Sequence, residues 1–228
     1  YNNRDIRLED IPEPIMEDGD LLIKTVSSGI CGSDVMEWYR VPKAPIILGH
    51  EVTGNIVQVG KGVNNFKEGD RVVVSHHVPC NECEYCKKNL HTACDTLRKT
   101  NFDPGGFCEF IRIPSINVVT GTFHLSEDIS FDEGVFVEPL GCVLRSQRVA
   151  RLRSKDNVLV IGAGISGLLH IKLALEKGCK KVFAADINEY RLQKAKEFGA
   201  EIVNSDIDIP NFLKDNLDGK LADQVILC

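Results

Sequence analysis

The second half of the chain alternates short apolar runs with longer amphipathic segments. Val158–Ile161 is a run of four apolar residues flanked by turn signals, a pattern typical of a strand buried in a parallel sheet. Ile165–Lys177 has apolar residues at helical spacing and is followed by Gly178, a residue type that often ends helices. The alternation continues with predicted strands at Lys181–Ala185, Glu201–Val203 and Asp223–Cys228 and predicted helices at Glu189–Phe198 and Ile209–Asn216. Strands that alternate with helices predict an α/β unit over residues 151–228.

The first part of the chain has a different pattern, in which short strand-like runs are separated by turns. Arg4–Asp10 alternates polar and apolar residues, and Leu21–Val26 and Arg71–Ser75 are rich in strand-forming residues. Gly54–Val63 also alternates like a strand, and its glycines favour a bend or a bulge. Phe131–Arg151 places apolar residues at helical spacing after an acidic start, which predicts one long helix. We therefore expect a β-rich domain over residues 1–150.

Composition and charge exclude several function classes. Of the 228 residues, 43% are hydrophobic and 26% are charged, which is ordinary for folded domains and excludes disorder. A net charge of −6 gives no support to nucleic-acid binding, and no apolar run approaches the roughly 20 residues that span a bilayer. Nine cysteines without a secretory signal favour metal ligands and free thiols in a reducing cytoplasm. Because the sequence begins at Tyr1 and stops after a predicted strand, we expect a fragment that ends partway through the α/β unit.

The segment VLVIGAGISG carries the spacing of a dinucleotide-binding loop. Gly162, Gly164 and Gly167 follow a predicted strand directly and open a predicted helix, and Asp186 ends the next strand 19 residues after Gly167. Gly162 allows a tight turn, Gly164 lets the backbone approach a pyrophosphate, and Gly167 allows close packing of helix on strand. The pattern predicts NAD binding, with an empty doubly wound domain as the alternative.

Three further side chains belong to this predicted cofactor site. Asp186 accepts hydrogen bonds from the adenine ribose hydroxyls and repels a 2′-phosphate, or it is a solvated carboxylate at a strand end. Arg191 lies near the adenosine or faces solvent, and Ser166 lies within the glycine-rich segment and completes the predicted set of cofactor-binding residues.

Two groups of residues are candidates for metal binding. Within fifteen residues, the first group has the spacing C-x2-C-x2-C-x7-C, which satisfies tetrahedral zinc with no open position and so predicts a structural site: Cys80, Cys83, Cys86 and Cys94. Free or disulfide-linked cysteines are the alternative, and a nucleic-acid-binding zinc ribbon fits poorly with an acidic chain. The second group is scattered along the sequence and supplies the thiol, imidazole and carboxylate types that a catalytic zinc uses: Cys31, His50, Glu51 and Glu138.

The segment around His50 resembles the signature of the zinc-containing alcohol dehydrogenases. Gly49-His50-Glu51 is followed by the matching residues Gly54, Gly60 and Val63, and the cysteine loop and glycine-rich segment follow in that family's order. The resemblance to medium-chain dehydrogenases covers essentially the whole chain, and VEPLG, with Glu138, is similar to the sorbitol and threonine dehydrogenase branch. It implies a GroES-like catalytic domain over 1–150 and a truncated Rossmann domain, a doubly wound parallel sheet, over 151–228.

The resemblance also implies roles for individual residues. Cys31 and His50 would bind the catalytic zinc, with Glu51 or Glu138 as third ligand, and the zinc would polarise a substrate hydroxyl. Ser33 would relay the substrate proton, or cap the following helix. Asp34 would fix the other ring nitrogen of His50, or act as an acid at a helix N-terminus.

The expected activity is oxidation of a secondary alcohol, a polyol or a threonine-like substrate by NAD. The alternatives are an aldose or primary-alcohol dehydrogenase of the same fold, or a non-catalytic NAD-binding protein stabilised by zinc. We expect one catalytic and one structural zinc, assembly of the full-length protein into a dimer or tetramer, and an inactive fragment. Similarity to threonine dehydrogenases also places His77 near the substrate pocket.

Overall fold

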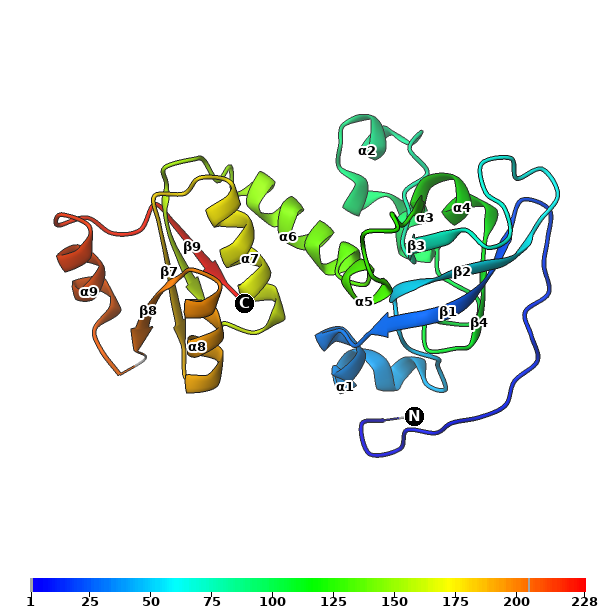
Figure 1. Cartoon of the computed structure of the whole chain (residues 1–228), viewed down its shortest axis with the longest axis horizontal. Coiled ribbons are helices and arrows are strands. Elements are labelled where there is room, and N and C mark those ends of the chain that lie inside the picture. The colour runs from blue at the N-terminus through cyan, green and yellow to red at the C-terminus, as the bar shows by residue number, and fades with distance from the viewer. Residues whose placement is uncertain (1, 205) are drawn as a thin grey trace. The chain divides into compact units, whose positions relative to one another are not determined.

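The computed structural model describes residues 2–204 and 206–228, which form two compact units, Tyr1–Glu138 and Pro139–Cys228 (Figure 1). The first unit is built on an antiparallel sheet and the second on a parallel sheet. Among the helices of the described residues, none combines the length and apolar character that a membrane span needs.

The sheet of the first unit has five antiparallel strands in the order β4-β1-β2-β3-β5. Their bounds are Leu21–Gly29 for β1, Glu51–Val59 for β2, Arg71–Ser75 for β3, Phe110–Ile113 for β4 and Thr122–His124 for β5. Ile23 of β1 is paired with Ile56 of β2 on one side and Ile111 of β4 on the other, and all three are buried. Directly paired residues share one face of a sheet, so this apolar row forms the centre of the first core.

Short helices lie in the connections between these strands. Arg112 of β4 donates to the buried Asp20 at 3.0 Å, and Asp20 accepts the backbone N–H of Ser115 at 2.9 Å, which fixes the start of one helix beside the sheet. The helices of this unit are η1 Gly32–Val35, α1 Glu37–Arg40, η2 Val41–Lys43, α2 Glu84–Lys87, η3 His91–Ala93, α3 Asp95–Lys99, α4 Ser115–Gly121 and α5 Phe131–Gly134.

Two predicted elements of the first unit are wrong, and a third begins elsewhere. Arg4–Asp10 is an exposed segment, not a strand, because no strand of the sheet pairs with it. The predicted helix Phe131–Arg151 is broken into α5 and α6, Val137–Val149, because Pro139 lacks the N–H that a continuous helix would need there. β2 runs from Glu51 to Val59, and the expected irregularity is present in it, because Val57 has no partner where the pairing with β1 shifts. Gly54 allows the carbonyl of Lys24 to approach closely.

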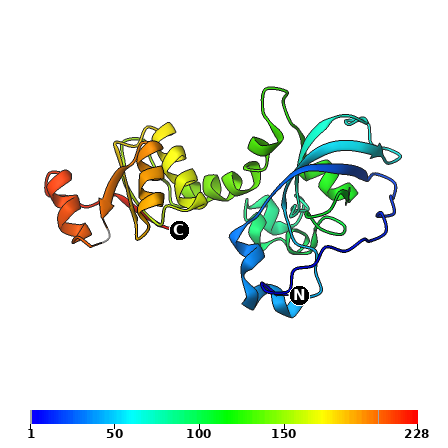
Figure 2. The same ribbon diagram turned by 60° about the horizontal axis from the view of Figure 1, so that its bottom comes forward.

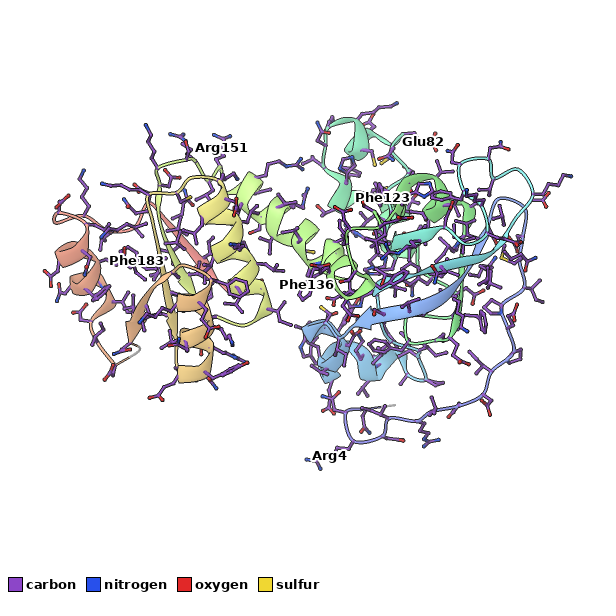
Figure 3. The ribbon with its side chains drawn as sticks, in the orientation of Figure 1. Arg4, Glu82, Phe123, Phe136, Arg151 and Phe183 are labelled. Atoms are coloured by element: carbon purple, nitrogen blue, oxygen red, sulfur yellow. The ribbon has the colours of Figure 1, made fainter. Side chains whose placement is uncertain are left out.

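The second unit confirms the predicted α/β class. Its four parallel strands have the order β8-β7-β6-β9, with β6 at Asn157–Ile161, β7 at Lys181–Asp186, β8 at Glu201–Asn204 and β9 at Gln224–Leu227. Helices α7, Ile165–Glu176, and α8, Glu189–Glu197, pack in the core on one face, and α9, Ile209–Asn216, packs on the other (Figures 1 and 2). Phe183 of β7, labelled in Figure 3, is fully buried against the ring edge of Phe212 on α9.

Helix α4 offers a direct test of the first core, since two adjacent valines differ in burial. Val118 is 6% exposed and Val119 is 82% exposed. Val118→Ala is expected to lower the free energy of unfolding by about 2 kcal/mol, from two buried methyl groups and the cavity that they leave. Val119→Ala should change it by no more than about 0.5 kcal/mol. Urea denaturation of both variants measures the difference, and equal effects would contradict this packing.

Candidate functional site

The four cysteines of the loop 80–94 meet at one point in the first unit. Their sulfur atoms all lie within 4.8 Å of one another, with Cys83 and Cys86 at 3.5 Å and Cys80 and Cys94 at 3.6 Å. Four thiolates around a zinc ion at about 2.3 Å would be separated by about 3.8 Å in a tetrahedron. The measured separations therefore fit a closed, four-coordinate metal site. Glu82, labelled in Figure 3, marks this loop.

Backbone N–H groups of the same loop point at the sulfur atoms. The N–H of Cys83 donates to the sulfur of Cys80 at 3.4 Å, and the N–H of Cys80 donates to the sulfur of Cys94 at 3.5 Å. The backbone N–H groups of Cys80 and Leu97 lower the pKa of the Cys94 thiol to about 6. The loop thus favours a thiolate at Cys94 before any metal arrives, whereas burial and the neighbouring thiols raise the pKa of Cys86 to about 12.

The second group converges because β1 and β2 are neighbours. Gly29, the last residue of β1, is paired with Glu51, the first residue of β2, so Cys31 emerges beside His50 and Glu51. One ligand atom of each of these three residues lies within 4.8 Å of the others, and His50 and Glu51 are buried. A Cβ at position 29 would lie 2.1 Å from Glu51 Oε2, so only glycine leaves room for this carboxylate.

The charges around these three residues favour a cation. Burial opposes the protonation of His50, but the carboxylate of Asp34 and the thiol of Cys31 outweigh it and raise the pKa of His50 to about 9. Burial raises the pKa of Glu51. His50 therefore retains a proton near neutral pH when no metal is bound, and a divalent cation would take the place of that proton.

Glu138 is the fourth member of this group, and the structure separates it from the other three. It is not among the ligand atoms that meet within 4.8 Å. Burial raises the pKa of its carboxyl group, and the charges of Glu51 and Asp34 add to that effect, while His50 opposes it. Glu138 therefore lies close enough for the charges of the centre to act on its carboxyl group, and its role as a ligand stays a prediction.

Ser33 and Asp34 lie in η1, directly after Cys31. Asp34 is buried and accepts the backbone N–H of Cys31 at 3.0 Å, and its other oxygen lies 3.4 Å from Nδ1 of His50. The side chain of Cys31 in turn accepts the backbone N–H of Ser33 at 3.5 Å, which completes a capping box at the start of η1. Asp34 thus occupies the place that orients the imidazole of His50.

Arg40 is a residue of this site that the sequence reasoning missed. Its guanidinium donates to the Ser33 carbonyl at 2.8 Å and to Ser33 Oγ at 3.2 Å, and lies 3.4 Å from the carboxylate of Asp34. No sequence pattern marks Arg40, because η1 and α1 are separate short helices with the extended residue Met36 between them.

Two further histidines extend from His50. The ring of His76 lies 4.7 Å from that of His50 and 3.9 Å from that of His77, measured between centroids. Nδ1 of His77 lies 2.6 Å from the carbonyl of Thr100, while Nδ1 of His76 is buried with no hydrogen-bond partner among the described residues. The structure thus brings His77 into the neighbourhood of the candidate centre, through His76.

The glycine-rich segment of the second unit has the geometry of an anion-binding turn. Gly162 has φ +97°, a conformation that favours glycine, and Gly164 is the N-cap of α7 without a side-chain cap. A Cβ at Gly164 would meet nothing within 4 Å, whereas a Cβ at Gly167 would lie 1.9 Å from the carbonyl oxygen of Gly162. The first turn of α7 therefore presents uncapped N–H groups to open space, which fits a pyrophosphate. Ser166 lies in this first turn and is exposed.

Asp186 lies at the end of β7, next to this segment. Its Oδ2 accepts the N–H of Ala163 at 2.7 Å, and its Oδ1 accepts the N–H of Asn188 at 2.8 Å. Burial opposes ionisation of Asp186, but these backbone N–H groups outweigh it and lower the pKa of the carboxyl group. Nη1 of Arg191 lies 3.9 Å from Asp186 Oδ2. Asp186 is therefore a carboxylate beside the turn, with a guanidinium close to it.

Comparison with known proteins gives a consistent result. Residues 17–122 match the alcohol dehydrogenase GroES-like domain. Sorbitol dehydrogenase of Mus musculus is 36% identical over 205 residues, which cover 86% of this chain and 56% of that protein. Probable D-xylulose reductase A of Aspergillus clavatus is 35% identical over 207 residues, covering 87% of this chain and 57% of that protein.

A solved structure agrees over the full length of the chain. Alcohol dehydrogenase TADH from Thermus sp. ATN1 superposes with a TM-score of 0.85 at 27% identity, covering 100% of this chain and 69% of that one. The chain spans a little over half the length of the curated relatives that it matches.

The two groups of metal-binding residues are expected to differ in what they stabilise. Cys83→Ser should remove one zinc per chain and lower the melting temperature by several degrees, because about 10 kcal/mol of metal binding orders such loops. Cys31→Ser should also remove one zinc, with a smaller fall in melting temperature. The control is replacement of the exposed Cys228 by Ser, which should leave both zinc ions bound. Metal analysis and thermal denaturation measure these quantities, and equal losses of stability in the first two variants would contradict the distinction.

Proposed function

The chain belongs to the zinc-containing medium-chain alcohol dehydrogenase family, and we propose on that premise that it oxidises a secondary alcohol or polyol with NAD. The observation that supports this most directly is the convergence of Cys31, His50 and Glu51 within 4.8 Å. Three protein donors leave one position of a tetrahedral metal open, as catalysis requires. The named relatives act on sorbitol and xylulose, which favours a polyol over a simple primary alcohol.

The residues of the first unit have complementary roles in this proposal. Zinc, when bound by Cys31, His50 and Glu51, supplies the Lewis acid that polarises the substrate hydroxyl. Asp34 fixes the imidazole of His50 from its other nitrogen, at 3.4 Å. Ser33, two residues after Cys31, takes the substrate proton. The cysteine loop 80–94 holds a second zinc that stabilises this unit.

The residues of the second unit bind the cofactor. NAD, when bound, supplies the hydride acceptor. The N–H groups at the start of α7, around Gly164 and Ser166, receive the pyrophosphate, and Asp186 accepts hydrogen bonds from the ribose hydroxyls. Arg191 lies beside Asp186 and contacts the adenosine. Gly162 and Gly167 shape the turn.

The proposal includes a setting for the protein. We infer a reducing cytoplasm, because cysteines that hold zinc must remain thiolates, and assembly into a dimer or tetramer, which only the family resemblance supports. The partner is a small alcohol or polyol. Neither nucleic acid nor a membrane surface is expected, in keeping with the net charge of −6.

The test is NAD reduction by the zinc-loaded protein at its full natural length. The substrates are sorbitol, xylitol, galactitol-1-phosphate, threonine, an aldose and ethanol, followed at the absorbance of NADH. We expect the highest kcat/KM with a polyol, and no turnover after replacement of Cys31 by Ser. If kcat/KM is highest with the aldose or with ethanol, the proposed substrate class is wrong. Zinc and NAD binding without any turnover would identify a non-catalytic protein.

Cofactor choice depends on Asp186 in this proposal. The wild-type protein is expected to prefer NAD over NADP, because a 2′-phosphate would face a carboxylate. Asp186→Ser should reduce that preference at least about tenfold in the ratio of kcat/KM values. The exposed Asp215 of α9, changed to Ser, is the control and should leave the ratio unchanged. Equal use of both cofactors by the wild type would contradict the role of Asp186.

Glu138 is a predicted ligand outside the three converging donors, so a variant at this position separates two possible roles of its carboxylate. We expect its carboxylate to hold water at the zinc or to bind the metal during turnover. Glu138→Gln keeps the shape and removes the charge, so kcat should fall at least about tenfold, which is about 1.4 kcal/mol in the barrier. Folding and NAD binding should change little. The exposed Glu127, changed to Gln, is the control. Normal turnover with slightly lower stability would make Glu138 a helix N-terminal acid only.

A further inference from the structure

We propose that Arg40 is a positioning residue for the candidate centre: it holds the Ser33 hydroxyl and the Asp34 carboxylate in their working orientations. The proposal rests on the proposed dehydrogenase function, because Ser33 is the proton acceptor in that function. Arg40 is not one of the three converging donors, and it acts through its contacts with Ser33 and Asp34.

The contacts of Arg40 converge on one short segment. Nε donates to the carbonyl of Ser33 at 2.8 Å, and Nη2 donates to Ser33 Oγ at 3.2 Å. The same Nη2 lies 3.4 Å from Oδ1 of Asp34, and this oxygen also lies 3.4 Å from Nδ1 of His50. One guanidinium therefore fixes both the backbone and the side chain of Ser33, and shares with His50 the carboxylate that orients the imidazole.

The hydrogen-bonding chemistry of arginine makes this contact directional. A guanidinium only donates, so Ser33 Oγ is an acceptor toward Arg40, and the hydroxyl hydrogen of Ser33 points elsewhere. The second lone pair of Oγ stays available for the substrate proton. When Oγ accepts that proton, Ser33 releases its own hydrogen to a water molecule, so the serine is unchanged after the step. The fixed positive charge of Arg40 favours the release of that hydrogen.

The neighbouring cation, Lys43, cannot take over the contacts that Arg40 makes with Ser33. Nζ of Lys43 lies 3.5 Å from the ring centroid of Tyr39, and the guanidinium carbon of Arg40 lies 4.9 Å from the same centroid. Tyr39 therefore lies against both cations, and the planar fork of Arg40 is aimed at Ser33. A lysine at position 40 would keep a charge, but it could not make the paired Nε and Nη2 contacts in one plane.

The test compares Arg40→Gln, Arg40→Lys, Ser33→Ala and the double variant Ser33→Ala with Arg40→Gln, in the zinc-loaded protein at its full natural length. The exposed Arg98 of α3, changed to Gln, is the matched control. The measurements are kcat and KM with the best polyol, zinc content and melting temperature. Turnover is measured with and without added guanidinium chloride at millimolar concentration, below the range that unfolds proteins.

We expect Arg40→Gln to lower kcat about tenfold or more with unchanged zinc content and a nearly unchanged KM for NAD. Added guanidinium should restore part of the lost kcat in Arg40→Gln and should not raise kcat in the other proteins. Arg40→Lys should have a kcat close to that of Arg40→Gln. The double variant should be no slower than Ser33→Ala, because Arg40 acts through Ser33. The melting temperatures of the four proteins in the cycle should also be non-additive, since one hydrogen bond joins the two side chains.

Three results would overturn the proposal. The first is a wild-type kcat in Arg40→Gln. The second is additive losses of kcat in the double variant, which would make the two residues independent. The third is a loss of kcat together with zinc, without rescue by guanidinium, which would give Arg40 a purely structural role. An inactive wild type would instead contradict the dehydrogenase function, and the non-additive melting temperatures would still report the contact between Arg40 and Ser33.

Discussion

The pairing of β1 with β2 is the interaction on which the candidate centre depends. The register that joins Gly29 to Glu51 fixes where the chain leaves β1, and therefore where Cys31 lies relative to His50. Ile23, Ile56 and Ile111 are buried and hold β1 between β2 and β4, and an extra residue of β1, Val26, shifts the pairing by one position between this row and Gly29. A slip of one residue would turn every side chain of the strand to the opposite face and separate the three donors. The chemistry of the centre thus depends on the pairing of β1 with β2 and on the apolar packing that holds these two strands together.

The centre also joins charge to backbone geometry. The four residues 31–34 carry a thiol, a hydroxyl and a carboxylate. The guanidinium of Arg40 contacts the hydroxyl and the carboxylate. The buried carboxylate of Asp34 lies 3.4 Å from both Arg40 and His50, so positive charge already offsets part of the cost of burying it. Metal binding would replace the proton on His50 with a divalent charge beside the side chains of Cys31 and Glu51.

Sequence reasoning was most successful where the signal is local. The parallel strands and helices after Asn157 lie where their periodicity predicted, because a buried strand and an amphipathic helix each have their own period. Cys80 and its partners were also recognisable from spacing alone. The antiparallel unit was harder: Arg4–Asp10 has the alternation of a strand but no partner strand, and pairing depends on distant residues. Arg40 escaped notice for the same reason, because its role is defined by contacts and an arginine on a short helix has no distinctive pattern.

The four thiolates of the cysteine loop all come from residues 80–94, whereas Cys31 follows β1, and His50 and Glu51 lie at the start of β2. The cysteine loop is therefore a self-contained module in the engineering sense. It could be exchanged for another stabilising device, such as a tightly packed hairpin, while the donors at Cys31, His50 and Glu51 stay where the sheet places them. Descendants of such a protein are free to lose one metal and keep the other, whereas the scattered donors must be inherited together with the strands that present them.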